Sequence, residues 1–308
     1  DAEAAMVRDV RTMFYDILLA HAAVTVREES VAQLQALRVN AEAKFTNGKA
    51  SEFDVITARV KLANEKPELL NARNQHDVAL EGFKRLLNVT DEVFQVEGQL
   101  TFTPVDADLA ILQEGALRNR PAVHYLETTA ALKEQDVAAA KADYQPSIST
   151  FFLYNGANSY RFASYSSDWE WHWSAGGALQ WNILDGGLTA GTVRQKRLEL
   201  DKMRTDIEEF RKAVRLEVKQ AYLDMMYARQ TVEAGSGAVE LAKKAMDIAK
   251  TRYGAGLATY LEYTDANLAL RQAELALHLA MRGHMNAVAR LEYAAGGDGA
   301  LWKRATAK

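Results

Sequence analysis

The sequence contains no cysteine and only 4 prolines among its 308 residues. The lack of cysteine excludes disulfide frameworks, thiolate metal sites and cysteine nucleophiles. Because glycine and proline are both sparse, long stretches contain neither, and this favours extended helices over a sandwich of short strands. No run of about 18 apolar residues occurs, which excludes a transmembrane helix, so any membrane contact must use strands.

A large net charge is also missing. The formal net charge is -4 and the isoelectric point is about 6.0, so no positive field attracts nucleic acid, and we expect none as a partner. Asp1 opens directly in a helical pattern without signal-peptide features, which indicates a mature or truncated product.

Sequence features of enzymes are absent as well. The chain has no glycine-rich phosphate loop, nucleophile elbow or catalytic acid pair. Its histidines show no ligand spacing such as His-x-x-x-His. We therefore expect no enzyme activity, no cofactor and no metal site. The histidines are His21, His76, His124, His172, His278 and His284.

The chain contains one internal repeat at an offset of 208 residues, as from Val10 to Val218. Both copies indicate a long helix, a short glycine turn and a second long helix. Apolar residues recur at sevens, which is coiled-coil spacing, so we expect two long helical hairpins that need neighbours. The expected helices span residues 3–46, 50–88, 192–253 and 257–294. Matching pairs include Phe45 with Tyr253, Gly48 with Gly256, Asp54 with Glu262, and His76 with His284.

A strand pair is predicted between the hairpins. Over residues 169–183 the odd positions are mostly apolar and the even positions mostly polar or small, which is strand periodicity. A weaker alternation runs from Ile148 to Tyr154. Tryptophans lie at both ends of the apolar face, about 25 Å apart, as in the lipid-facing girdles of an outer-membrane barrel. The alternative is a sandwich strand with a buried tryptophan face. The expected girdle consists of Trp169, Trp171, Trp173 and Trp181.

The expected fold is mainly α with a small β part. Two strands cannot close a barrel, so several chains or further residues must supply the rest. The expected divisions are a first helical hairpin at 1–88, a connector and helix at 89–145, a β-hairpin at 146–187, a second helical hairpin at 188–296, and a tail at 297–308.

Three segments, in order, carry a family resemblance. They are Asn119-Arg120-Pro121 followed by Pro146-Ser147-Ile148, then 181–187 (Trp-Asn-Ile-Leu-Asp-Gly-Gly), then 252–266. Together they resemble the TolC-like outer-membrane efflux proteins, and the likeness covers nearly the whole chain. The family has a strand hairpin in each repeat, and we expect that the one preceding residue 1 is truncated.

The resemblance implies a bacterial outer-membrane protein with most of its chain in the periplasm. It implies a homotrimer that forms a β-barrel on a periplasmic α-barrel and contacts outer-membrane lipid. The implied function is a passive exit duct of a tripartite efflux or type I secretion system, working with a periplasmic adaptor protein and an inner-membrane pump. Drugs, metal ions and polypeptides all fit as cargo. The alternative is a soluble periplasmic coiled-coil scaffold without channel activity.

The resemblance also implies site residues at the hairpin tips. Asp54, Glu262 and Asp265 lie early in their helices, and the spacing of the last two puts them on one helix face, as for an acidic aperture. The alternative is that such acids simply favour the positive end of a helix. Tyr253 matches an aromatic residue that braces the closed state. The implied adaptor-docking residues are Asn47, Gly48, Lys49, Gly254, Gly256, Leu257, Ala258 and Thr259.

Overall fold

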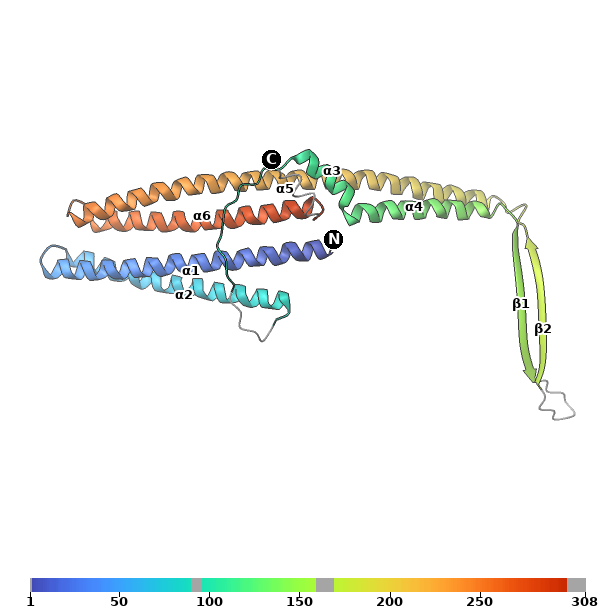
Figure 1. Cartoon of the computed structure of the whole chain (residues 1–308), viewed down its shortest axis with the longest axis horizontal. Helices are drawn as coiled ribbons and strands as arrows, with labels where there is room; N and C mark the ends of the chain where they lie inside the picture. Colours follow the sequence, from blue (N-terminus) through green and yellow to red (C-terminus); the bar gives the residue numbers. More distant parts are fainter. Residues whose placement is uncertain (1, 90–95, 159–168, 298–308) are drawn as a thin grey trace. The chain divides into compact units, whose positions relative to one another are not determined.

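The structure is a computed structural model, and it describes residues 2–89, 96–158 and 169–297 (Figure 1). The described part is mostly helical with a two-stranded antiparallel sheet, which confirms the expected fold class. None of the described helices is long and apolar enough to cross a membrane. The elements are α1 (Ala2–Thr46), α2 (Glu52–Leu87), α3 (Leu109–Asn119), α4 (Pro121–Ala142), β1 (Ser147–Asn158), β2 (Trp169–Gln180), α5 (Leu188–Gly254) and α6 (Tyr260–Ala294).

The chain divides into two compact units. The first comprises residues 1–121 and 212–308, and therefore holds α1, α2, α3, α6 and the later part of α5. The second comprises residues 122–211 and holds nearly all of α4, the β-hairpin and the start of α5.

The two helical hairpins turn in the same way. Gly48 and Gly256 have φ of 68° and 76°, in the left-handed region that glycine adopts without strain. After each turn an extended residue caps the next helix, Ser51 for α2 and Thr259 for α6. These caps explain why α2 and α6 begin two and three residues later than the sequence pattern indicated, because a capping residue lies outside the helix that it starts.

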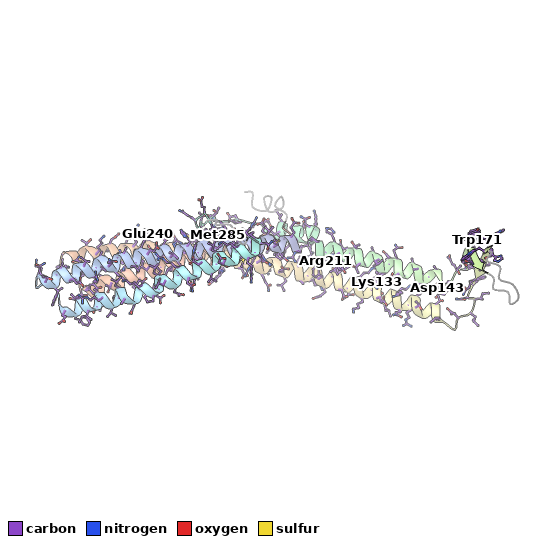
Figure 2. The ribbon with its side chains drawn as sticks, turned by 90° about the horizontal axis from the view of Figure 1, so that it is seen from below. Lys133, Asp143, Trp171, Arg211, Glu240 and Met285 are labelled. Atoms are coloured by element: carbon purple, nitrogen blue, oxygen red, sulfur yellow. The ribbon has the colours of Figure 1, made fainter. Side chains whose placement is uncertain are left out.

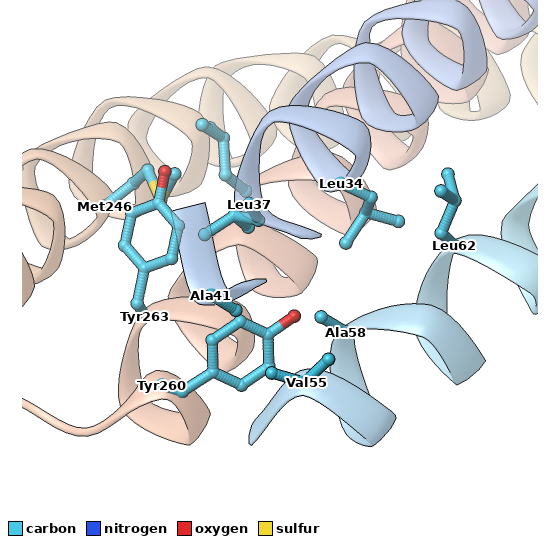
Figure 3. Packing of buried hydrophobic residues seen from close by; sticks show 10 residues of the cluster. Leu34, Leu37, Ala41, Val55, Ala58, Leu62, Met246, Tyr260 and Tyr263 are labelled. Carbon is cyan, nitrogen blue, oxygen red and sulfur yellow. The ribbon is translucent and has the colours of Figure 1, made fainter. Parts of the chain in front are cut away.

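Four long helices pack together near the tips of the hairpins in the first unit (Figure 3). Ala41 on α1 and Ala58 on α2 are fully buried, so these two backbones approach closely. Tyrosines from α6 and a methionine from α5 fill the space beside them. The buried cluster is Leu34, Leu37, Ala41, Val55, Ala58, Leu62, Met246, Tyr260, Tyr263 and Leu270.

In the second unit, α4 lies along the start of α5. Val193, Leu200 and Ile207 are buried on α5 at intervals of seven, as expected for coiled-coil packing. Exposed ion pairs flank this seam and each contributes little to stability. They join Lys133 to Glu199 at 3.2 Å, Arg204 to Glu134 at 3.3 Å, and Arg211 to Glu127 at 2.8 Å. Figure 2 labels Lys133 and Arg211 on these helices.

The strand pair runs antiparallel, with Tyr154 opposite Trp173 and Gly156 opposite Trp171. The ring of Trp171 stacks on Tyr154 at 5.2 Å, and it lies over Gly156, where an added Cβ would come within 2.8 Å of the ring. A larger residue opposite this tryptophan would therefore force its ring to shift. The other face carries two large apolar side chains from β1, Phe151 and Leu153. The expected alternation of apolar and polar residues therefore holds better on β2 than on β1.

The last expected girdle residue lies outside the strand. The sequence pattern extended the second strand to residue 183, but β2 ends at Gln180, so this part of the prediction is wrong. The indole Nε1 of Trp181 donates a hydrogen bond to the backbone oxygen of Tyr144 at 3.2 Å. This bond ties the base of the β-hairpin to the turn after α4 and draws the chain out of the ladder.

The turn glycines allow a matched stability test. Gly256→Ala should destabilise the protein by about 1–2 kcal/mol, because alanine is strained at positive φ. Gly254→Ala should be neutral or stabilising by up to about 1 kcal/mol, because Gly254 is helical and an added Cβ meets nothing within 4 Å. Thermal unfolding followed by circular dichroism measures both. Equal melting temperatures for the two variants would contradict the assigned turn geometry.

Candidate aperture at the hairpin tips

Three tyrosines of the second hairpin, Tyr253, Tyr260 and Tyr263, meet at its tip. Figure 3 shows two of them, Tyr260 and Tyr263. The Tyr253 ring stacks on Tyr263 with centroids 5.4 Å apart, and meets the edge of Tyr260 at 6.2 Å. Lys44 reaches this group from α1: its Nζ lies 3.7 Å from the Tyr253 ring centre and donates to the Tyr253 backbone oxygen at 3.4 Å. The aromatic residue expected to brace the tip thus joins the two hairpins of one chain.

The tyrosine hydroxyls stay protonated at neutral pH. Burial raises the pKa of Tyr253, Tyr260 and Tyr263 above its usual value, and the pKa of Tyr260 reaches about 12. The negative charge of Asp54 adds to the effect of burial on the pKa of Tyr253. The hydroxyl of Tyr260 is buried and has no hydrogen-bond partner among the described residues.

Two of the three expected aperture acids complete capping boxes at the starts of their helices. The Asp54 carboxylate accepts from the backbone N–H of Ser51 at 3.1 Å and from its hydroxyl at 2.9 Å. The Glu262 carboxylate accepts from the backbone N–H of Thr259 at 2.8 Å. Each forms a capping box, because the hydroxyl also accepts from the backbone of the acid. These bonds are what the alternative interpretation expects, in which acids near the start of a helix interact with its N-terminal backbone N–H groups.

The third acid has a different environment. The Asp265 side chain is 64% exposed, and its Oδ1 lies 4.0 Å from Nζ of Lys61 on α2. Lys61 also donates a hydrogen bond to the hydroxyl of Thr264, which is buried at 3% exposure. A single lysine of the first hairpin therefore contacts two neighbouring residues of the second. The sequence analysis did not identify Lys61, because its partners lie about 200 residues away in the chain and no local sequence pattern predicts such a contact.

The expected docking residues lie around the two turns. Most of them are exposed, and Leu257 is 71% exposed at the end of the second hairpin. Ala258 is only partly exposed, since the chain turns there into the Thr259 cap of α6.

The expected girdle tryptophans of β2 share one face of the hairpin. Trp169, Trp171 and Trp173 are 62%, 59% and 70% exposed. Trp181 is 56% exposed, beyond the strand end. Among the residues that the structure describes, no group of three or more histidines and acids is placed to hold a metal ion.

The comparisons with known proteins agree with this architecture. The family model for outer membrane efflux protein matches residues 112–297. The chain therefore belongs to the outer membrane efflux protein family, and this confirms the resemblance and the outer-membrane location expected from the motifs.

Individual relatives are distant and longer. The chain is 21% identical over 257 residues to the alkaline protease secretion protein AprF of Pseudomonas aeruginosa, covering 82% of this chain and 53% of AprF. It is 27% identical over 194 residues to protein CyaE of Bordetella pertussis, covering 62% of this chain and 40% of CyaE. The chain thus spans about half the length of the curated relatives it matches.

Solved structures share the fold. The outer membrane protein VceC of Vibrio cholerae superposes with a TM-score of 0.76 at 17% identity, covering 96% of this chain and 70% of VceC. The CmeC outer membrane channel of Campylobacter jejuni superposes with a TM-score of 0.75 at 17% identity, covering 96% of this chain and 63% of CmeC.

The buried hydroxyl of Tyr260 generates a pH prediction. Tyr260→Phe should be as stable as the parent protein or more stable by about 1 kcal/mol at pH 7, because it removes an unpaired buried polar group. The raised pKa means that the folded state favours the protonated hydroxyl, so its contribution is intact below pH 10 and lost as pH rises towards 12. Tyr260→Phe should therefore lose less stability in this range.

Thermal unfolding from pH 8 to 11 measures the difference. Tyr227→Phe is the matched control, because Tyr227 is 73% exposed and its hydroxyl group should contribute little. An identical alkaline loss of stability in the Tyr260→Phe variant and the parent protein would contradict the role of burial.

Proposed function

We propose that this chain forms a homotrimeric outer-membrane duct through which cargo leaves the periplasm passively. The observation that carries the proposal is the pair of long hairpins that share the same glycine turn and capping box, in a chain of the outer membrane efflux protein family. A periplasmic adaptor would dock on the hairpin tips, and an inner-membrane pump would supply the energy for export. The name of AprF refers to protease secretion, which favours a polypeptide cargo for this chain as well.

Two surfaces without a partner among the described residues support association of several copies. Phe53, Ile56 and Val60 are 74%, 52% and 52% exposed along one stripe of α2, at the spacing of a helix face that packs on a neighbour. The strand pair leaves backbone groups unpaired at its outer edges, and lipid offers them no partner. Copies of the chain around one axis would cover both. The exposed tryptophan face argues against the alternative of a soluble scaffold.

The tips supply a candidate gate. On a three-fold axis, Asp265 and Glu262 of each copy would bring six carboxylates together, with Asp54 nearby. Their mutual repulsion and their attraction for cations grow as the opening narrows and water is excluded. Lys61, 4.0 Å from Asp265, would reduce this negative field. The exposed turns around Gly48 and Gly256 would receive the adaptor.

Conductance through planar bilayers tests the duct and its aperture. The full-length protein should show low, cation-selective conductance that trivalent lanthanide ions block. Asp265→Asn with Glu262→Gln should weaken the block by about tenfold or more, since it removes two charges per chain. Glutamine at position 262 can still complete the capping box, so the tip should keep its fold.

Lys61→Met should have the opposite effect and strengthen the block several-fold. Lys66→Met is the matched control, because it removes the same charge from the exposed surface of the same helix. A protein with no conductance would contradict the duct. Undiminished block in the double variant, in a protein that conducts, would contradict only the acidic aperture.

Membrane insertion should depend on one face of the β-hairpin. Trp171→Arg should impair insertion modestly, because it removes an aromatic side chain from the lipid-facing face and arginine near a membrane interface costs up to about 1 kcal/mol. His172→Arg, on the opposite face of the same strand, should be tolerated. The fraction of each variant that floats with outer membranes in a density gradient measures insertion. Equal impairment by both substitutions would contradict the orientation of the strand.

A further inference from the structure

Two histidines on different helices of the first hairpin lie close together. His21 belongs to α1 and His76 to α2, and their ring centres are 5.8 Å apart with an angle of 53° between the ring planes. Because they lie on different helices, the spacing of histidines along the sequence could not reveal the pair. The expectation of no metal site rested on that spacing alone.

The separation of the rings suits a shared metal ion. Two imidazoles that bind one Zn²⁺ through nitrogens at about 2.1 Å, with a tetrahedral angle between them, have ring centres about 5 Å apart. The observed 5.8 Å between ring centres is close to this value, so rotation of the side chains can bring one nitrogen of each ring to the same ion. The His76 side chain is 27% exposed and His21 is exposed, so an ion can enter and water can complete its coordination.

A neighbouring carboxylate prepares one of the rings. Nδ1 of His76 lies 3.3 Å from Oδ1 of Asp77. A carboxylate only accepts hydrogen bonds, so this contact favours the tautomer with the proton on Nδ1 and leaves the electron pair of Nε2 for a metal. Carboxylates play this orienting part beside many metal-binding histidines.

The second repeat differs at both positions. At the repeat offset, His76 corresponds to His284 and His21 corresponds to Arg229. His284 is 2% exposed and meets the edge of the Phe102 ring at 5.0 Å. Burial, with the charge of Arg229 as a second cause, holds the pKa of His284 below its usual value. A buried histidine beside an arginine cannot form such a pair, so the feature belongs to the first hairpin alone.

We propose that His21 and His76 together bind a divalent transition-metal ion, such as Ni²⁺ or Zn²⁺, that ties α1 to α2. Imidazole is a preferred ligand of these ions. With two protein ligands and water in the remaining positions, the ion exchanges with solvent. Because the two nitrogens come together only in the folded hairpin, binding stabilises the hairpin along its length.

Binding of Ni²⁺ to the full-length, detergent-solubilised protein without a polyhistidine tag tests this site. Equilibrium dialysis should find one saturable site per chain. His21→Gln and His76→Gln should each weaken binding by about 100-fold or more, and Asp77→Asn by about tenfold, since it removes only the orienting partner. His124→Gln is the matched control, because His124 lies on α4 in the other unit.

Hydrogen exchange gives a second measurement that does not depend on the variants. Ni²⁺ should slow amide exchange around His21 and around His76 in the parent protein, and leave the equivalent turns near Arg229 and His284 unchanged. Either of two results would overturn the proposal: binding that survives in one of the two histidine variants, or slowed exchange spread evenly over both hairpins.

Discussion

The packing of four long helices near the hairpin tips is the interaction on which the rest of the structure depends. A hairpin of two such helices cannot bury its apolar residues alone, so α1 and α2 pack on α5 and α6 of the same chain. Ala41 and Ala58 let the backbones approach, and the tyrosines fill the remaining space. This packing brings together residues about 200 positions apart, and the contacts of Lys44 with Tyr253 and of Lys61 with Thr264 and Asp265 follow from it.

The same packing separates the three tip acids into two kinds. Asp54 and Glu262 are held by backbone N–H groups of their own caps, so their orientation is set within one turn of helix. The Asp265 side chain is largely exposed, and its ion-pair partner, Lys61, belongs to the other hairpin. Of the three acids, Asp265 is therefore the one whose electrostatic environment a relative movement of the hairpins would change most. A gate built on this chain would be sensitive to movement through Asp265 and Lys61.

The strand pair follows a different rule, because it has no core of its own. Its tryptophan face stays exposed, and stacking of Trp171 on Tyr154 over Gly156 orders the side chains along the hairpin. Trp181 leaves the ladder to bond the turn after α4, which anchors the base of the hairpin to its helices. Such an apolar surface is stable when lipid covers its tryptophan face and further strands pair with its edges. An outer-membrane barrel offers both.

The sequence by itself determined whatever depends on near neighbours in the chain. Sequence patterns could predict the left-handed turns at Gly48 and Gly256, the helices that follow them and the alternation along β2. Each of these depends only on the conformational preferences of neighbouring residues and on which side chains avoid water. The repeat and the motifs also sufficed to recognise the family. Contacts across helices were decided only by the tertiary structure, as for Lys61 with Thr264 and His21 with His76. Their partners are far apart in sequence, and only the register of one long helix against another sets which side chains meet.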